Sequence, residues 1–404
     1  MHVIIVIDIR SLMTPHRTGV GEYTVGLLTA LFEIDKKNQY LLFYNSLARV
    51  STFFPKWQSE NVFFVKVGWP NKILNSAVLF YHQPDLDNLT IKYHNNLVIQ
   101  QSSHVTMKQS SNLIFKKCDI FFSPNLNFTT VSESVKHVLT IHDLSFEFLP
   151  DCFIKKQLLW HKLLNPERQC QRADLILTPS KNTKSDVIWY YGVKEEKVRV
   201  LYPGVDSGQS TSLSVDQLAM ATVKKKYHLP EKFILFLGTI EPRKNIRGLI
   251  EAFRRLKAYD LVIAGAKGWN NNDVFQAIQT TPQVQYIGYV DEADKPALYQ
   301  LADVFIYPSL YEGFGFPVVE AMQFGTPVVT SNRSSLPEVT NGAAYLVNPI
   351  NYAEIASAIQ LLLTDVQLRT YFVIHGRAQA QKFQWRKAAS KLLELFSEVS
   401  SSTY

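Results

Sequence analysis

Two glutamates flank a short glycine-bearing segment in the second half of the chain. Glu312 and Glu320 are eight positions apart (320 − 312 = 8) and enclose the residues GFGFPVV. An apolar run at residues 304–307 precedes this segment and another at 328–330 follows it, which predicts a strand, a loop, a short helix and a strand. The backbone N–H groups at the start of such a helix have no intrahelical partner, so they can bind an anion.

The two carboxylates restrict the class of ligand that could carry this anionic group. A carboxylate repels phosphate, but it accepts hydrogen bonds from hydroxyl groups. A ligand that has hydroxyl groups on both sides of a phosphate bridge is a nucleotide sugar. The alternative is an acidic helix N-terminus, in which Glu320 only complements the helix dipole.

A basic pair lies at a second predicted strand-to-helix turn. Arg243 and Lys244 follow an apolar run at residues 233–237 and precede Asn245, a suitable helix N-cap. Two cations at the positive end of a helix dipole are unfavourable unless an anion joins them. A diphosphate would supply that anion, with the arginine binding through two hydrogen bonds and the lysine as a point charge. Exposed residues on an ordinary loop are the alternative.

The first half of the chain adds a histidine. His142 and Asp143 follow an apolar run at residues 138–141, where the carboxyl end of a parallel strand would open towards a ligand. Taken alone, this histidine is better explained as a structural one, bonded to Asp143 or to a backbone carbonyl group.

A glycine pair lies between another predicted strand and helix. Gly19 and Gly21 come after an apolar run at residues 3–7 and before apolar residues with helical spacing at 22–32. Glycines allow a ligand to approach the backbone closely. The dinucleotide fingerprint GxGxxG is absent, because Thr24 occupies the place of its last glycine. On their own, such glycines more often form only a turn.

The stretch EGFGFPVVE resembles the E-x7-E motif of the retaining glycosyltransferases of family 4, which have the GT-B fold. This resemblance implies that Glu320 binds the ribose hydroxyl groups of a nucleotide and that Glu312 contacts the donor sugar. It also implies that the backbone at Gly313, Phe314 and Gly315 holds the diphosphate.

Three further segments carry the same resemblance. TGVGEYT is similar to the family's loop beside the donor phosphate, which assigns Gly19 and Gly21 to donor binding. TIHDLSFEFLP resembles the segment whose histidine reaches the donor sugar, here His142. GTIEPRKN is similar to the segment that stabilises the leaving diphosphate, here through Arg243 and Lys244.

One position departs from the family pattern. The resemblance places Gly238 and Thr239 beside the donor, but many relatives have an arginine where this chain has Thr239. We expect Arg243 to supply the missing charge; without it, activity or donor choice would differ from those of the family.

The elements that must position these residues alternate between strand and helix, which indicates parallel sheets. A chain of 404 residues is long enough for two domains. We therefore predict two Rossmann-like α/β domains that face each other across a cleft, as in the GT-B fold. The acceptor-side domain would comprise residues 1–205 and the nucleotide-sugar-binding domain residues 206–384, with the boundary in a Ser/Gly/Gln-rich segment. A final helix at 385–404 would pack back onto the first domain, and residues 153–172 are predicted to form one long helix.

The overall charge of +7 is compatible with nucleic acid, an anionic membrane surface or an anionic small substrate. The basic residues are dispersed, and no zinc-finger, RNP-like or helix-turn-helix pattern occurs, so nucleic acid is not expected.

The first apolar run ends at Asp8, too short for a signal peptide or a membrane span. Three scattered cysteines indicate a reducing cytosol, and a lipid-linked acceptor would favour peripheral contact with the inner membrane face.

The segments IDIRSL, TGVGEYT, TIHDLSF and GTIEPRKN are similar to bacterial mannosyltransferases that build surface polysaccharides such as lipopolysaccharide. The similarity favours GDP-mannose as the donor and a lipid-linked saccharide or polysaccharide as the acceptor, while UDP-glucose or another donor stays open. No Asp-x-Asp motif lies near the site, so neither a metal nor a cofactor is expected. Two alternatives remain: a nucleotide-sugar epimerase of the same fold, and a catalytically silent subunit that binds a polysaccharide or a partner enzyme.

Overall fold

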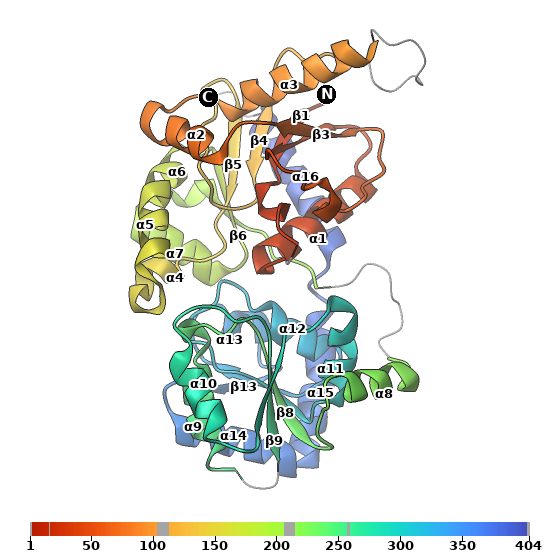
Figure 1. Cartoon of the computed structure of the whole chain (residues 1–404), viewed down its shortest axis with the longest axis vertical. Helices are drawn as coiled ribbons and strands as arrows, with labels where there is room; N and C mark the ends of the chain where they lie inside the picture. Colours follow the sequence, from red (N-terminus) through yellow and green to blue (C-terminus); the bar gives the residue numbers. More distant parts are fainter. Residues whose placement is uncertain (1, 16, 103–112, 206–214, 257–258, 402–404) are drawn as a thin grey trace.

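The computed structural model of the chain describes residues 2–15, 17–102, 113–205, 215–256 and 259–401. It contains two α/β domains, each built on a parallel sheet (Figure 1). Residues 206–214, where we predicted most of the boundary segment, lie outside the described part. None of the helices in the described part combines the length and the apolar character that crossing a membrane would require.

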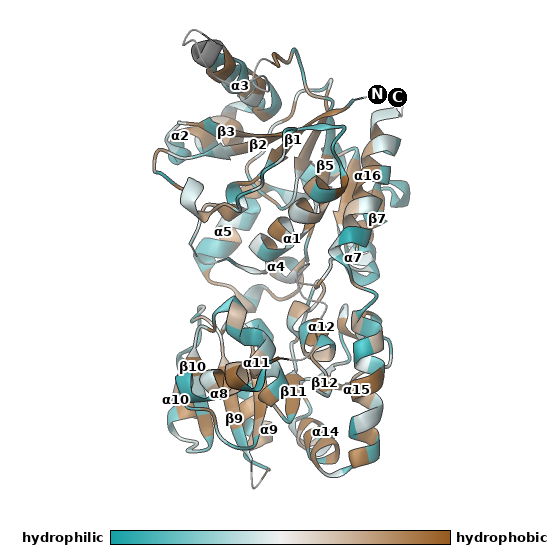
Figure 2. Cartoon of the chain, turned by 90° about the vertical axis from the view of Figure 1, so that its right-hand side faces the viewer, coloured by the Kyte–Doolittle hydropathy of each residue, from teal (hydrophilic) through white to brown (hydrophobic). Residues whose placement is uncertain are grey.

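The first sheet has seven strands in the order β3-β2-β1-β4-β5-β6-β7. Their bounds are β1 Ile4–Asp8, β2 Gln39–Asn45, β3 Val62–Val67, β4 Ile120–Ser123, β5 Lys136–Thr140, β6 Leu175–Thr178 and β7 Val198–Val200. The central strands are almost continuously apolar because helices cover both faces of a parallel sheet. Figure 2 shows this as brown strands beneath helices with teal outer faces.

The second sheet has six strands in the order β10-β9-β8-β11-β12-β13. Their bounds are β8 Phe233–Leu237, β9 Asp260–Ala264, β10 Val284–Gly288, β11 Val304–Tyr307, β12 Val328–Ser331 and β13 Tyr345–Val347. Strands β8 and β11 are neighbours although three helices and two strands separate them in the chain, so the order reverses between them. Ligands bind at such switch points in open α/β sheets, at the carboxyl ends of the strands.

Helices of the first domain surround its sheet. They are α1 Gly19–Ile34, α2 Asn71–Ser76, the π-helical turn η3 Ala77–Tyr81, α3 Leu86–Ser102, α4 Ser145–Phe148, α5 Lys155–Leu164, α6 Pro166–Arg172 and α7 Lys181–Tyr191. The predicted long helix over 153–172 was wrong: it is divided into α5 and α6. Asn165 adopts a left-handed conformation (φ 49°), and Pro166, which has no N–H, begins the next helix.

Helices of the second domain follow the same pattern: α8 Gln217–Lys226, α9 Ile246–Phe253, α10 Asn272–Gln279, α11 Lys295–Leu301, α12 Phe316–Gln323, α13 Leu336–Thr340, α14 Tyr352–Thr364 and α15 Val366–Ala380. The last helix, α16 Trp385–Ser401, returns to the first domain and packs on α1 (Figure 1). Leu392 and Phe396 of α16 are buried in the same core as Leu28 of α1. A Cβ atom on Gly26 would lie 2.2 Å from the Trp385 ring, so this contact requires a glycine in α1.

Candidate active site

Two loops of the second domain leave the sheet side by side. The loop after β8 contains the 3-10 turn η6 (Pro242–Lys244), and the loop after β11 contains Glu312. Because β8 and β11 are adjacent and parallel, both loops emerge at the same edge, at the switch point of the sheet. The backbone N–H of Leu310 donates to the carbonyl oxygen of Arg243 at 2.9 Å and links the two loops. The basic pair and the first glutamate are thus brought together.

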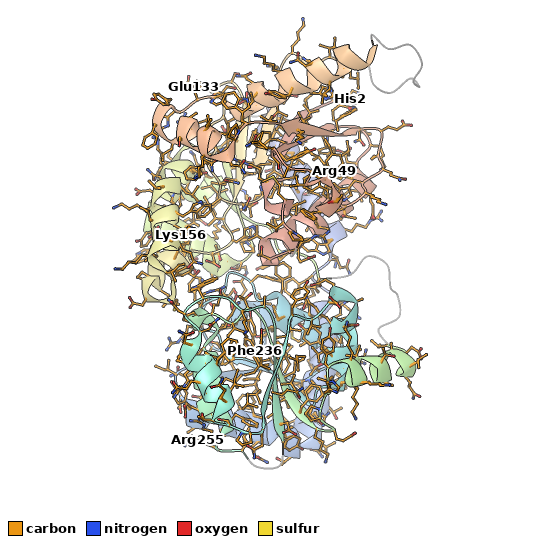
Figure 3. All side chains as sticks on the ribbon, viewed as in Figure 1. His2, Arg49, Glu133, Lys156, Phe236 and Arg255 are labelled. Atoms are coloured by element: carbon orange, nitrogen blue, oxygen red, sulfur yellow. The ribbon has the colours of Figure 1, made fainter. Side chains whose placement is uncertain are left out.

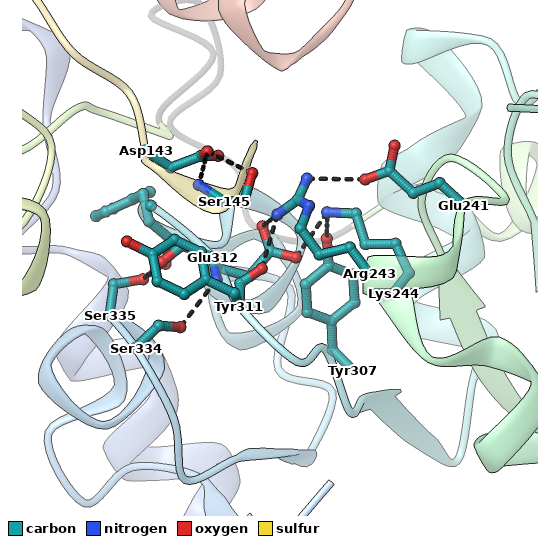
Figure 4. A network of polar contacts seen from close by, with 12 residues as sticks. Asp143, Ser145, Glu241, Arg243, Lys244, Tyr307, Tyr311, Glu312, Ser334 and Ser335 are labelled. Atoms are coloured by element: carbon teal, nitrogen blue, oxygen red, sulfur yellow. Dashed lines mark hydrogen bonds and ion pairs between the residues drawn. The ribbon is translucent and has the colours of Figure 1, made fainter. Parts of the chain in front are cut away.

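A buried charge network occupies this edge (Figure 4). The Lys244 Nζ atom lies 2.6 Å from Glu312 Oε1, and Arg243 Nη1 lies 3.0 Å from Glu312 Oε2. Arg243 Nη2 also pairs with Glu241 Oε1 at 2.8 Å, while Lys244 donates to the Tyr307 hydroxyl at 2.6 Å. One carboxylate therefore holds both cations of the predicted pair.

This arrangement fixes the protonation state of Glu312. Desolvation by burial opposes ionisation, but attraction to Arg243 and then to Lys244 outweighs it and lowers the pKa of Glu312 to about 2. The carboxylate is therefore ionised at neutral pH.

The prediction that the two cations wait for an external anion needs correction. Arg243 and Lys244 are already neutralised by Glu241 and Glu312, two carboxylates for two cations. The glutamate two positions before Arg243 was visible in GTIEPRKN as a signal for this pairing. Asn245 occupies the N-cap position of α9 as predicted, but its side chain makes no capping hydrogen bond, since its Nδ2 donates to the carbonyl oxygen atoms of Pro308 at 3.2 Å and of Pro349 at 2.6 Å.

The glycine loop after Glu312 provides free backbone donors. Gly315 has a left-handed conformation (φ 98°) and precedes α12 as its N-cap. Within the described part of the chain, the N–H groups of residues 313–316 have no acceptor. The carbonyl groups of Glu312 and Phe314 are instead fixed by the Ser335 hydroxyl, at 2.9 and 3.1 Å. The loop therefore presents amide donors from an ordered backbone, as the sequence predicted.

The side chains of this loop have structural roles. The Phe314 ring is buried and meets the Phe383 ring edge-on at 5.2 Å, so only its backbone can contact a ligand. A Cβ atom on Gly313 would lie 1.9 Å from the carbonyl oxygen of His142 in the other domain. Gly313 thus permits the two domains to approach each other at this point.

His142 lies just beyond β5, on the first-domain side of the cleft. Its Nε2 atom is 2.8 Å from the carbonyl oxygen of Pro124, so Nε2 carries the proton. Burial lowers the pKa of His142, so the imidazole is neutral, and its ring meets that of Tyr23 edge-on at 4.7 Å. The backbone-bonded arrangement that we weighed as a structural explanation is present, but the residue also lines a cavity.

That cavity lies between the domains and has a volume of about 260 Å³. The first domain contributes His142 and Asp143 to its lining, and the second contributes Glu241, Arg243 and Trp269. Pockets for whole small ligands usually measure about 300–1,000 Å³. The cavity therefore has room for a sugar rather than for a complete nucleotide sugar.

Two lining residues that the sequence did not single out add polar groups. Within the described residues, Asn125 Oδ1 and His161 Nδ1 are buried without a hydrogen-bond partner. The His161 ring stacks on Phe146, with centroids 3.9 Å apart. Buried polar atoms are normally satisfied, so these two are candidates to bind ligand hydroxyl groups. No local sequence pattern marks them, because the fold alone brings them to the cavity.

The second glutamate lies outside this cavity lining. Glu320 accepts a hydrogen bond from the Tyr299 hydroxyl at 2.7 Å. Burial opposes the charge of Lys295, but Glu320, Glu292 and Glu22 together raise its pKa. Glu22 belongs to the first turn of α1 in the other domain and interacts with both Lys295 and Glu320, so Glu320 lies within electrostatic range of that helix end.

The glycine pair itself sits inside a helix rather than ahead of one. Helix α1 begins at Gly19, so Gly19 and Gly21 form its first turn, a correction to the predicted turn between strand and helix. A Cβ atom on Gly19 would meet nothing within 4 Å, so the helix end is open.

Gly238 and Thr239 directly follow β8. The Gly238 amide donates to the carbonyl oxygen of Ala264 at 2.9 Å. Thr239 forms no ion pair or side-chain hydrogen bond in the described part of the chain, and it takes no part in the charge network. The Arg243 guanidinium is engaged by the carboxylates and by the carbonyl oxygen of Tyr311 at 2.7 Å.

Polar contacts hold the two domains together around the site. The Glu338 carboxylate accepts hydrogen bonds from the backbone N–H groups of Lys181 at 2.8 Å and Asn182 at 3.1 Å, at the start of α7. The Trp269 indole donates to the carbonyl oxygen of Cys152 at 2.7 Å, and the Tyr311 hydroxyl donates to Asp186. These residues carry no sequence signal, because their partners lie more than 100 positions away.

Comparison with known proteins agrees with this geometry. The model described as "Glycosyl transferases group 1" matches residues 221–379, and that described as "Glycosyltransferase Family 4" matches residues 103–209. O-antigen chain mannosyltransferase B of Escherichia coli is 32% identical over 286 residues, which cover 69% of this chain and 74% of that protein. The serotype-specific mannosyltransferase WbdA of Escherichia coli is 31% identical over 59% of this chain but only 31% of its own length.

Solved structures show the same architecture. The crystal structure of Anabaena HepE in complex with UDP-glucose superposes with a TM-score of 0.68 at 17% identity, over 98% of this chain and 100% of that one. At this identity the likeness establishes the fold: two Rossmann-like domains in the GT-B arrangement, as predicted.

Proposed function

The chain belongs to glycosyltransferase family 4, and from this premise we propose that it transfers mannose from GDP-mannose to a lipid-linked saccharide or polysaccharide acceptor. The transfer would retain the configuration at the anomeric carbon. Two relatives named as mannosyltransferases, one of them an O-antigen chain enzyme, support the sugar and the acceptor class. HepE, whose complex contains UDP-glucose, supports a nucleotide sugar as the type of donor.

The observation that carries the proposal is the shared carboxylate at the switch point. Glu312 holds both Arg243 and the buried Lys244 in fixed positions, and Arg243 lines the cavity that His142 also lines. Preorganised charges and dipoles stabilise a transition state most effectively, because they need not reorganise during the reaction. The cluster next to the free amides of 313–316 is such a preorganised environment for a leaving diphosphate.

Each residue then has a definite task. Arg243, Lys244 and the amides of the glycine loop would neutralise charge that develops on the departing diphosphate. Glu312 would keep both cations in place and accept a hydroxyl group of the sugar, while the neutral His142 would position that sugar. Glu320 would accept the ribose hydroxyl groups. Because these groups can supply the charge that a metal would otherwise supply, the proposal requires neither a divalent ion nor a cofactor.

The test is the release of GDP from GDP-mannose by the purified protein. We expect slow release without an acceptor and faster release with a lipid-linked saccharide, and NMR of the product should show the donor's anomeric configuration. Binding without turnover across a panel of donors and acceptors would instead identify a silent subunit. Conversion of the donor into another nucleotide sugar would identify an epimerase. A donor panel measured by thermal shift would decide between GDP-mannose and UDP-glucose.

The same proposal places the enzyme in the cytoplasm, with peripheral contact to the anionic inner face of the membrane where its acceptor resides. Fractionation of cells at low and high salt would test this, since an electrostatic contact is released by salt. Recovery of the protein outside the cytoplasm would contradict it.

A further inference from the structure

A second cavity lies in the first domain, away from the charge network. Its volume is about 520 Å³, twice that of the cavity between the domains (520/260 = 2). It is bounded by the turn η3, by residues 128–135 between β4 and β5, and by the helices α5 and α6. Of the residues labelled in Figure 3, Glu133 belongs to the lining of this cavity. Neither the sequence motifs nor the comparisons assign a role to this cavity.

Three cations line this cavity without a direct ion-pair partner in the described residues. Lys162, Arg168 and Arg172 form no ion pair within the described part of the chain. Arg168 and Arg172 are four residues apart on α6, a spacing at which like charges repel each other. Arg168 Nη1 donates to the ring nitrogen Nε2 of His82 at 3.0 Å. This contact orients the guanidinium without neutralising it.

The carboxylates near the cavity offset only part of these charges, and one of them, Asp85, lies outside the lining and interacts with Arg172. The lining itself contains Glu133 and Asp174. Asp174 is already engaged, because it pairs with Lys136 Nζ at 3.2 Å and accepts from the His137 amide at 2.9 Å. The cavity therefore has an excess of positive charge and favours an anion; two arginines in particular suit a phosphate group.

Neutral polar groups of the lining indicate that the ligand must also donate hydrogen bonds. In the described residues, Thr129 Oγ1 and Gln169 Oε1 are buried without a hydrogen-bond partner. The amide nitrogen of Gln169 is occupied, since it donates to the carbonyl oxygen of Leu164 at 2.7 Å. Its oxygen can only accept, so it needs a donor such as a hydroxyl group. Phosphate and hydroxyl groups together are the chemistry of a phosphorylated saccharide.

Exposed apolar side chains lie on two of the elements that bound the cavity. Phe80 and Tyr81 belong to η3 and are 71% and 78% exposed, and Leu163 of α5 is also exposed. Large apolar groups beside a cationic site suit a ligand in which the phosphate continues into an apolar chain.

The two cavities are neighbours across one pair of rings. Phe128 lines the larger cavity and Trp160 the smaller one, and their rings meet edge-on with centroids 6.4 Å apart. Helix α5 also contributes to the lining of both cavities, since Lys162 lines the larger one and His161 the smaller one. A ligand anchored by its phosphate in the larger cavity could therefore extend towards His142 and Arg243.

We infer that the larger cavity binds the phosphate-bearing end of the acceptor, a saccharide joined through phosphate to an apolar chain. The saccharide would pass the Phe128–Trp160 pair and present its hydroxyl group in the cavity between the domains. This inference rests on the proposed function, because it identifies the site at which that acceptor would be held.

The first experiment measures binding in the absence of any donor. Farnesyl diphosphate, below its micellar concentration, serves as the probe in isothermal titration calorimetry of the full chain. We expect the wild-type protein to bind it and the double variant Arg168→Gln/Arg172→Gln to bind at least tenfold more weakly, the size expected on loss of charge-assisted hydrogen bonds. The matched control is Arg49→Gln, an exposed arginine on another part of the first domain (Figure 3). Equal binding by the wild-type protein and the double variant would overturn the inference.

Two comparison probes identify the source of the phosphate. Inorganic pyrophosphate should bind much more weakly than farnesyl diphosphate, and equal affinity would indicate a site for a free anion. Vesicles of phosphatidylglycerol should not compete with the probe. If vesicles bind and farnesyl diphosphate does not, the surface is a membrane contact and the acceptor assignment is wrong. Circular dichroism of each variant verifies that it is folded.

The kinetic experiment separates this inference from the proposed function. With a prenyl-diphosphate-linked saccharide as acceptor, the double variant should show an acceptor KM raised by tenfold or more, with a smaller change in kcat. A fall in kcat alone would contradict the site assignment. If the wild-type protein releases no GDP from GDP-mannose, the proposed function fails, whereas the binding result with farnesyl diphosphate still decides whether the cavity recognises a lipid phosphate.

Discussion

The two cationic clusters of this chain differ in how their charges are compensated. The partly buried Arg243 and the buried Lys244 share the carboxylate of Glu312, whereas Arg168 and Arg172 are exposed and have no ion-pair partner in the described part of the chain. The buried cluster is held rigid before any ligand arrives, which suits the stabilisation of a short-lived charge. The exposed cluster is free to gain a ligand, which suits binding in the ground state.

The difference also concerns stability. In the buried cluster, folding removes four charged groups from water. Their ion pairs compensate this desolvation, so the loss of one charge leaves its partners uncompensated. In the exposed cluster, water solvates each cation, and the loss of one changes little. Substitutions in the two clusters should therefore have opposite profiles, with large effects on folding in one and large effects on ligand binding in the other.

The largest expected effect comes from removing the shared carboxylate. Glu312→Gln leaves Arg243 without one of its partners and Lys244 without its only ion-pair partner in the described chain. Breaking a buried ion pair in this way costs about 3–5 kcal/mol of unfolding free energy. Urea denaturation of the wild-type protein and the variant measures the difference. A loss below about 1 kcal/mol would mean that water or a rearranged partner compensates the cations.

Arg243→Gln should impair catalysis in addition to lowering stability, because it also leaves Glu241 and Glu312 without one of their ion-pair partners. It removes the cation that would stabilise the leaving diphosphate, and a preorganised donor of this kind contributes about 10²–10³ to kcat. The rate of GDP release with a saturating acceptor measures the loss. Arg255→Gln, an exposed arginine at the far end of the same domain (Figure 3), is the matched control and should keep its rate. A loss of less than about threefold for Arg243→Gln would refute its role in the reaction.

The buried cluster should also make folding sensitive to acid. The folded-state pKa of Glu312 is about 2, below its ordinary value of 4.5, so its ionisation stabilises the fold above pH 4.5. This contribution to the unfolding free energy is about 3 kcal/mol, because each unit of difference between the unfolded and folded pKa is worth about 1.4 kcal/mol. It is lost progressively as the pH drops from 4.5 towards 2. Unfolding free energies measured between pH 6 and pH 3 should decline more steeply for the wild-type protein than for Glu312→Gln. Parallel pH profiles would show that Glu312 does not titrate with folding.

The sequence predicted the parts of the site that depend on local pattern. The order of strands and helices follows from apolar runs and turns, and the paired glutamates, the basic pair and His142 stood in motifs with fixed spacing. The glycine loop with its free amides was predicted for the same reason. Such features are encoded within about ten residues, so a single chain reveals them.

What the sequence did not reveal depends on distant contacts. The neutralisation of Arg243 by Glu312 joins residues 69 positions apart, and Glu338 meets α7 across 157 positions. The break between α5 and α6 was a local feature that we missed: Asn165 before Pro166 signals a helix boundary, because proline disfavours the helical conformation of the preceding residue. That break matters, because it places Lys162 and Arg168 on different helices around one cavity.

The smallest expected effect lies in the exposed cluster. Arg168→Gln removes a like-charge repulsion with Arg172, worth about 0.2–0.5 kcal/mol, and loses the contact with His82. The unfolding free energy should therefore stay within about 0.5 kcal/mol of the wild-type value, as for most surface substitutions. Urea denaturation at low salt and at 0.5 M salt measures it, and any gain in stability should shrink at the higher ionic strength because salt screens the repulsion. A loss of several kcal/mol would show that this cluster, like the buried one, is part of the folded framework, and the distinction between the two would fail.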